Sequence, residues 1–370
     1  MMSIIKEASN GVHFYWITLS CFFIALPYIG PGFLGLIGIK PIWIIFIFCS
    51  VVFLGQVNIN IFVFMALFFF LDTIRILLIE SEISYEISLW MLMFIFISSR
   101  SFFREILHHE KMLRKFSMAF YGLFLCLYII NYLNSDIYEM FLRALVGQAR
   151  TQGRSDFAFL SPESGLGSFS ILIVAYLSFH VSSTKHIGLL IVPSLCLLVI
   201  HSATAVSLAL IWSAYYILNT RLSFNRAFLV IFMCLVFFIF FAYFSSDLLM
   251  QRFFAVINFD LYGSSSVSLR AQDVLRLFDL NTYMEAGVGG SVGIVKAVIF
   301  APFFSLAFLV LAFLYCKSSD FLLIFPALIL LPLTHPFVWV IVGISWARRT
   351  TFSKTLQPSF AGYFHISKRL

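Results

Sequence analysis

Long apolar runs dominate the chain, without the alternation of a half-buried strand or the narrow stripe of a surface helix. Residues 61–71 and 229–244 are two such runs, and both are rich in phenylalanine. Helices that are apolar on every face are either buried in a protein core or exposed to lipid. The pattern therefore predicts membrane-spanning helices rather than the elements of a soluble domain.

The lengths of the runs predict how often the chain crosses the bilayer. A hydrocarbon core of roughly 30 Å requires about 20 helical residues, and fewer in a tight hairpin. On this scale twelve spans lie near residues 13–29, 40–55, 58–79, 86–99, 116–133, 163–181, 187–201, 204–219, 227–245, 297–315, 320–333 and 336–347. A re-entrant hairpin is an alternative for the last two, which are interrupted by Pro326, Pro332 and Pro336. We expect an all-α, polytopic membrane protein whose residues 1–370 form a single domain.

Basic residues predict the orientation, because lysine and arginine in short loops favour the cytoplasmic side. The segment 100–115 carries Arg100, Arg104, Lys111, Arg114 and Lys115, and we assign it to the cytoplasm. Four predicted spans precede it, so the N-terminus is expected in the cytoplasm, and the even total puts the C-terminus there too. Two long segments, 134–162 and 246–296, then form large loops on the external face.

Composition and charge agree with this picture. Hydrophobic residues make up 61% of the chain and charged residues 11%, against about 25% charged in an ordinary soluble domain. The net charge of +7 is spread over short inter-span segments without interleaved aromatics, so it indicates topology rather than nucleic-acid binding. The six cysteines lie in or beside apolar segments without a Cys-x-x-Cys pair and are interpreted as packing residues. No cleavable signal peptide is expected, because Pro27 and Pro31 follow the first apolar run where a small-x-small site would stand.

Both external loops pair an arginine with a glycine at a helix entrance. Ten residues separate Arg154 from Gly165, while a serine-rich stretch leads into Arg270 and GVGG follows at 287–290. A guanidinium matches phosphate oxygens bidentately and stays charged. Glycines let backbone N–H groups approach an anion. The loops therefore predict a phosphate-bearing substrate at the outer surface.

Structural explanations of the same residues remain open. Arg270, Asp273 and Arg276 have the spacing of an ion-pair ladder on a helix surface. Arg150 and Arg154 are also placed to bind lipid headgroups at the interface. The GVGG sequence is typical of a turn. His335, in THPF, has a structural alternative as a locally bonded helix-end residue.

The two-loop arrangement resembles the superfamily of O-antigen ligases and Wzy-type polysaccharide polymerases. Its polymerases carry an Arg-x10-Gly motif in one periplasmic loop, which Arg154 and Gly165 match, and Arg-x15-Gly in another, from which Arg270 and Gly287 depart by one residue. The segment HSATAVSLAL at 201–210 is similar to the family's threonine- and serine-rich turn into an apolar helix. Many relatives have Glu-Pro-Ser after the first arginine, whereas here Glu163 follows the proline in SPES.

The resemblance implies a glycan polymerase in the bacterial inner membrane. Such an enzyme transfers a growing glycan from undecaprenyl diphosphate onto a lipid-linked repeat unit at the periplasmic face, sometimes with a chain-length regulator protein as partner. Fixed guanidinium charge takes the place of a divalent metal, and we expect neither metal nor cofactor. Arg154 and Arg270 are the catalytic candidates for binding the pyrophosphate, and Arg150, Arg276, Gly165, Gly287 and Gly289 are the candidate substrate-binding residues. The resemblance does not assign the general base. Glu163 and His335 are taken as the catalytic candidates for it, with Asp156 and Asp273 as alternatives near the predicted arginines.

Other functions fit parts of the pattern. A ligase would attach the finished glycan to its final lipid acceptor, but family ligases carry a histidine in the large loop, and residues 246–296 contain none. A lipid-linked oligosaccharide flippase would place ionisable groups at mid-membrane, whereas the predicted spans are nearly free of charge. A non-catalytic scaffold would tolerate loss of both loop arginines.

Overall fold

The computed structural model describes residues 18–27, 59–79, 102–104, 106–146, 157–161, 164–182, 185–200, 202–220, 228, 298, 302–331 and 335–355. Helices and short connections account for these residues, and no strand occurs among them. The main elements are α4 (Ile59–Ile79), α6 (Glu110–Leu133), α7 (Ser135–Val146), α8 (Ser164–Val181), α9 (Gly188–Val199), α10 (Ala203–Asn219), α15 (Pro302–Tyr315), η3 (Ser318–Asp320), α16 (Phe321–Leu330) and α17 (Pro336–Thr355). The all-helical prediction is confirmed for this part of the chain.

The apolar runs became helices close to their predicted bounds. Two of the described helices, α6 and α8, are long and apolar enough to cross a membrane, and α9, α10, α15 and α16 are shorter apolar helices. The predicted spans 40–55 and 86–99 lie outside the described residues, as do the external segment 246–296 and all of the span 227–245 except residue 228. The count of twelve spans therefore stays a prediction.

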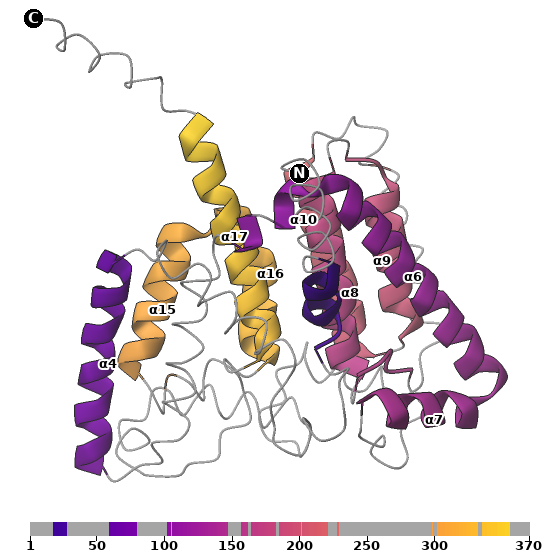
Figure 1. Ribbon diagram of the computed structural model, residues 1–370, viewed down its shortest axis with the longest axis horizontal. Coiled ribbons are helices and arrows are strands. Elements are labelled where there is room, and N and C mark those ends of the chain that lie inside the picture. The colour runs from indigo at the N-terminus through magenta and orange to yellow at the C-terminus, as the bar shows by residue number, and fades with distance from the viewer. Residues whose placement is uncertain are drawn as a thin grey trace, which may run out of the picture.

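Helix α8 lies at the centre of one group of helices and packs against α6, α9, α10 and α17 (Figure 1). It is buried on nearly every face from Gly167 to Val181, which explains why its sequence is apolar all round. Small residues such as Ser168 and Ser170 let neighbouring backbones approach closely. The centre of the described bundle is therefore a single helix enclosed by other helices.

A hydrogen bond to a carbonyl left free by a proline connects α9 to α10. Pro193 lies inside α9 and has no N–H, so the carbonyl of Leu189, four residues earlier, loses its partner within the helix. The indole Nε1 of Trp212 in α10 donates to that carbonyl oxygen at 3.1 Å. The carbonyl that the proline leaves without a partner in α9 thus accepts a hydrogen bond from the neighbouring helix.

Helix α15 takes its N-terminal cap from a different helix. Pro302 is its first residue, and the backbone N–H groups of Phe303 and Phe304 donate to the carboxylate of Asp72 in α4 at 3.3 and 2.6 Å. Asp72 is 1% exposed, and Arg75 lies 3.8 Å away on the next turn. An anion beside a helix N-terminus satisfies N–H groups that have no partner within the helix. Asp72 therefore fixes α4 against α15, which lie side by side in Figure 1.

The segment 134–162, predicted only as an external loop, begins with a helix. Asn134 caps α7 by accepting from the N–H groups of Asp136 and Ile137, both at 3.1 Å. Tyr138 and Leu142 are buried, while Arg143 and Glu139 form an exposed pair at 3.5 Å. In Figure 1 α7 lies across the end of α6.

Replacing Asp72 by alanine is expected to destabilise the protein by about 1–2 kcal/mol, because two helix N–H groups lose their acceptor. Asp72→Asn retains one acceptor oxygen and should cost less. The measurement is equilibrium unfolding of the purified protein in mixed detergent micelles. Asp136→Ala, which removes an exposed carboxylate from the first turn of α7, is the control, and an equal loss in the control would contradict the capping role.

Candidate functional site

The structure describes part of the predicted site. Gly165 lies in the first turn of α8, and His335 immediately precedes α17. Phe169 of α8 and Phe337 of α17 stack with ring centroids 6.2 Å apart, which brings the two helix starts to the same end of the bundle. The other predicted site residues lie outside the described residues: Arg150, Arg154, Glu163, Arg270, Arg276, Gly287 and Gly289.

The chain between Arg154 and Gly165 contains a tightly buried segment. Residues 157–161 are at most 4% exposed and pack between α6, α7 and α8. The Phe157 ring lies 5.2 Å from that of Tyr138 in α7 and 5.3 Å from that of Phe124 in α6. Phe159 lies 5.1 Å from Phe120 and 5.0 Å from Phe124. Aromatic contacts on several sides therefore fix this short stretch.

The backbone of the same segment is strained. Phe159 and Leu160 have φ values of 37° and 39°, in the left-handed region that bulky residues rarely adopt. Such conformations cost on the order of 1–3 kcal/mol each and persist only where the surrounding packing determines them. The strain gives the chain a sharp reversal before α8, and strained backbone clusters at functional sites.

The close approach of the segment 157–161 to α8 requires a glycine at position 167. A Cβ at Gly167 would lie 2.3 Å from the carbonyl oxygen of Ala158, a contact that cannot be accommodated without moving backbone. At Gly165 the nearest atom would be Oγ1 of Thr204 at 3.5 Å, which is ordinary contact. The steric demand therefore falls two residues after the glycine of the predicted motif. Thr204, in the threonine- and serine-rich turn, does lie beside the start of α8 as its contact with Gly165 shows.

His335 has a structural role at the start of α17. It is 5% exposed, its Nδ1 accepts from the N–H of Phe337 at 3.2 Å, and its carbonyl accepts from the N–H of Val338. The ring lies 4.8 Å from that of Phe337. These contacts agree with the alternative of a locally bonded helix-end residue. A role for His335 in catalysis stays a prediction.

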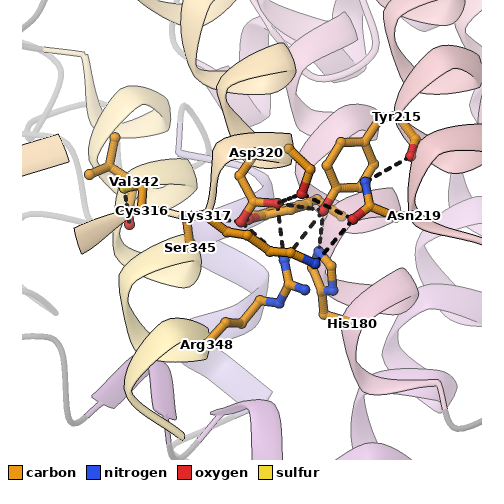
Figure 2. A network of polar contacts seen from close by, with 11 residues as sticks. His180, Tyr215, Asn219, Cys316, Lys317, Asp320, Val342, Ser345 and Arg348 are labelled. Carbon is orange, nitrogen blue, oxygen red and sulfur yellow. Dashed lines mark hydrogen bonds and ion pairs between the residues drawn. The ribbon is translucent and has the colours of Figure 1, made fainter. Parts of the chain in front are cut away.

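A second polar centre, absent from the sequence-based prediction, lies at the other end of the same helices (Figure 2). Asp320 at the start of α16 is fully buried, and its carboxylate accepts from side chains of three other helices. The donors are Tyr176 of α8 at 2.8 Å, Tyr215 of α10 at 2.7 Å, Ser345 of α17 at 2.6 Å and Nη1 of Arg348, also of α17, at 3.0 Å from both oxygens. We call Asp320, Tyr176, Tyr215, Ser345 and Arg348 the Asp320 cluster.

The contacts of Asp320 indicate what the cluster does. A carboxylate offers about four acceptor positions, and the tyrosines, Ser345 and Arg348 occupy them. A buried charge is stable only when it is paired and its remaining hydrogen-bonding capacity is used. With its lone pairs engaged by fixed donors, Asp320 is suited to holding helices together rather than to accepting a proton from a substrate.

Further polar contacts extend the cluster toward the helix ends. His180 Nε2 lies 2.7 Å from the Tyr215 hydroxyl, and Ser319 donates to the Asn219 side-chain oxygen at 3.0 Å. The backbone N–H of Lys317 donates to Ser345 Oγ at 3.2 Å. The loop before α16 is thereby attached to both α10 and α17.

Lys185 lies in the connection between α8 and α9 and contacts the C-terminal end of α8. Its ammonium donates to the carbonyl oxygens of Phe179 and Ser182, which lie at the end of α8. Burial lowers the pKa of Lys185 to about 8, with Arg348 acting in the same direction and Glu110 in the opposite one. A cation at a helix C-terminus satisfies carbonyls that have no partner within the helix.

The sequence does contain a signal for this cluster. Asp320 is the only acidic residue after Glu285, and it stands directly before an apolar run. Lys317 lies in a short basic connection between predicted spans and Arg348 directly after the last one, where the sequence alone indicates only topology. A lone carboxylate at the entrance of a predicted span points to a buried partner, but its identity requires the tertiary structure. Within the described ranges, no group of three His, Cys, Asp or Glu residues is placed to hold a metal ion.

Breaking the Asp320 pair is expected to be severely destabilising. Arg348→Met would leave a buried carboxylate without its counter-charge and should cost about 3–5 kcal/mol. Asp320→Asn combined with Arg348→Met removes both charges, so the double variant should unfold at higher denaturant than Arg348→Met alone. Glu139→Gln, which neutralises the exposed partner of Arg143, is the control and should change stability by less than about 1 kcal/mol. Additive effects of Asp320→Asn and Arg348→Met would contradict direct coupling.

Gly167→Ala and Gly122→Ala form a matched pair. Both glycines are helical, but a Cβ at Gly122 meets nothing within 4 Å, whereas at Gly167 it meets Ala158. Gly122→Ala should be neutral or stabilising by up to about 1 kcal/mol. Gly167→Ala should destabilise the protein and increase protease cleavage around 157–161, measured by limited proteolysis. Similar behaviour of the two variants would show that the segment 157–161 is not held against α8.

Comparisons of the chain with protein-family models, with curated proteins and with solved structures found no match. The resemblance of the loop motifs to the polymerase superfamily therefore stands on the residues of this chain alone. The fold class is established for the described residues, and a functional conclusion has to come from the site.

Proposed function

We propose that this chain is a multi-pass protein of the bacterial inner membrane that polymerises a lipid-linked glycan at the periplasmic face. In this reaction a growing glycan leaves undecaprenyl diphosphate and joins a hydroxyl group of a lipid-linked repeat unit. The observation that carries the proposal is the buried, strained segment 157–161, which lies between Arg154 and α8 in the sequence.

The outer surfaces of the helices support the location in a membrane. Helix α6 passes the length and apolarity test for a membrane span, yet only 22% of that stretch is buried inside the protein. Large apolar side chains are also exposed on α4, α15 and α16, including Leu67, Phe313 and Phe325. Contiguous exposed apolar surface of this kind is rare on soluble monomers. A lipid environment would cover it.

The proposed chemistry depends on the two loop arginines. The departing pyrophosphate develops negative charge, and fixed donors aimed at that charge lower the barrier without reorganising. Arg154 and Arg270 would bind the pyrophosphate, supported by Arg150 and Arg276. An arginine can serve this purpose only if its backbone is held in place. The anchored segment three residues after Arg154 supports such preorganisation.

Glu163 is one of the candidates for the general base in this proposal. His335 is the other candidate, but its Nδ1 is already engaged with the backbone of Phe337. Glu163 precedes α8 directly, close in sequence to the fixed segment. The acceptor hydroxyl would need orientation and, where a proton is removed, a carboxylate within hydrogen-bond reach.

A lipid-linked oligosaccharide transporter is the second candidate, and the Asp320 cluster is the observation that favours it. Ionisable residues buried within membrane helices often mark transport pathways. Against this, the Asp320 carboxylate is fully engaged by fixed donors. The first candidate therefore accounts better for the loop motifs and for the saturated contacts of Asp320.

The test is glycan chain length in a deletion strain complemented with variants. Arg154→Ala and Arg270→Ala should each lower the polymerisation rate by about 10²–10³, the usual effect of removing one preorganised donor, and gels should show single repeat units in place of long chains. Arg143→Ala removes an exposed arginine on the same predicted loop and should leave chain length unchanged.

The other functions predict different results. Loss of all glycan on the final acceptor, including single repeats, would indicate a ligase. Accumulation of lipid-linked units at the cytoplasmic face would indicate a transporter. Normal chain length in both arginine variants, with normal expression, would refute the assignment of the site.

A further inference from the structure

A cavity of about 500 Å³ lies between α6, α8 and α9, away from both the strained segment and the Asp320 cluster. Glu110, Leu113, Arg114, Ser117, Met118 and Tyr121 line it from α6. Their spacing of three and four residues puts them on one face of that helix, over about three turns. The cavity is therefore a groove along α6, closed on its other side by the end of α8 and the first half of α9.

The lining changes from charged to apolar along the groove. Arg114 and Glu110 lie near the start of α6, and His186 lies in the connection between α8 and α9. Met118 on α6 and Val192 on α9 border the groove and are 69% and 40% exposed. Because these exposed borders are apolar, the groove opens sideways to the surroundings of the bundle. A ligand with a charged head and a hydrocarbon chain matches this gradient.

Charge around the mouth of the groove favours an anionic head. Arg104, Lys111 and Lys115 are exposed on or next to the same end of α6, and no described residue forms an ion pair with Arg114. Glu110 is the one carboxylate of the lining, and it lies close enough to Lys185 for the two charges to interact. The free guanidinium at the mouth is therefore Arg114.

One polar group of the groove lining has no hydrogen-bond partner among the described residues. The hydroxyl oxygen of Tyr121 is buried, and no described residue hydrogen-bonds to it. A buried, unpaired hydroxyl costs about 1–3 kcal/mol. The Cα atoms of Tyr121 and Arg114 are about 10 Å apart along the helix axis, by the rise per residue. A second polar group of the same ligand, such as an ester carbonyl below a headgroup, would satisfy the Tyr121 hydroxyl.

We propose that this groove binds an anionic phospholipid, with its phosphate at Arg114 and His186, an ester carbonyl at Tyr121 and an acyl chain along Met118 and Val192. This inference does not depend on glycan polymerisation, but only on the chain lying in a membrane. The basic end of α6 is the end predicted to be cytoplasmic, where anionic lipids are attracted to clusters of lysine and arginine. A bound lipid would fill the groove between α6 and α9.

The experiment measures phosphatidylglycerol bound to the purified full-length protein in detergent by native mass spectrometry, with phosphatidylcholine of the same acyl chains as the comparison. Phosphatidylglycerol should bind more tightly than phosphatidylcholine. Arg114→Gln should weaken the binding of phosphatidylglycerol about fivefold, which is the contribution expected of one cation near a lipid phosphate. Val192→Trp fills the groove without changing charge and should weaken binding at least as much. Inorganic phosphate in large excess should not displace the lipid, because it lacks the chain.

Lys111→Gln is the matched control, because it removes an exposed cation from α6 outside the groove and should change binding less than twofold. Thermal unfolding of each variant without added lipid shows that it is folded. The proposal is overturned if Lys111→Gln weakens binding as much as Arg114→Gln, which would show diffuse surface attraction. It is also overturned if the folded Val192→Trp protein retains full binding, or if the two lipids bind equally.

Discussion

A single buried carboxylate fixes how four of the described helices of this protein meet. Asp320 has no exposure to solvent, so its charge must be compensated inside the protein. Donors from α8, α10 and α17 supply that compensation, and no one of these helices can move away without leaving a charge or hydroxyl unpaired. In an apolar bundle, where dispersion contacts are similar for many arrangements, such a constraint selects one arrangement from the others.

Asp72 applies the same principle on the other side of the described bundle. There a carboxylate from α4 caps α15, whose first turn begins with proline and offers no capping side chain of its own. α15 in turn contacts α17, the helix that carries Ser345 and Arg348. The two carboxylates therefore connect helices that the sequence separates widely, and both do so through hydrogen bonds that lipid cannot replace.

The two ends of the bundle have different chemistry. At one end lie the aromatic, strained segment 157–161, the close contact of Gly167 and the helix start with His335. At the other end lie the Asp320 cluster, Lys185 and the groove with Arg114. This division agrees with the predicted topology, which places the helix starts at 164, 203 and 336 on one side and the basic connections on the other. A rigid bundle of this kind would hold external loops at fixed positions, as the proposed reaction requires.

Hydrophobic patterning was sufficient to predict that the described residues are helical and where most of their helices lie. Helices α6 and α17 extend beyond the predicted 116–133 and 336–347. Helices α4, α8, α10 and α15 follow the runs predicted at 58–79, 163–181, 204–219 and 297–315, because a helix in an apolar environment satisfies its own backbone and needs only a long apolar sequence. The motif from Arg154 to Gly165 also spans the segment 157–161, which is buried and strained in the structure. The sequence did not indicate that the steric constraint belongs to Gly167 or that α7 forms within a predicted loop. The local bonding of His335 was one of the two interpretations that the sequence left open.

The pairing of helices was decided only in three dimensions. Asp320, Tyr176 and Tyr215 come from distant parts of the chain, and nothing in the local sequence of any one of them identifies the others. The positive φ values of Phe159 and Leu160 likewise run against local preference. They persist because both residues are buried and the rings of Phe120 and Phe124 in α6 pack against Phe159. The length of the apolar runs thus determined the helices of the described chain, because that property is local to each run. The burial of a few polar groups determined how the helices are arranged, because compensation of a buried charge depends on every helix that surrounds it.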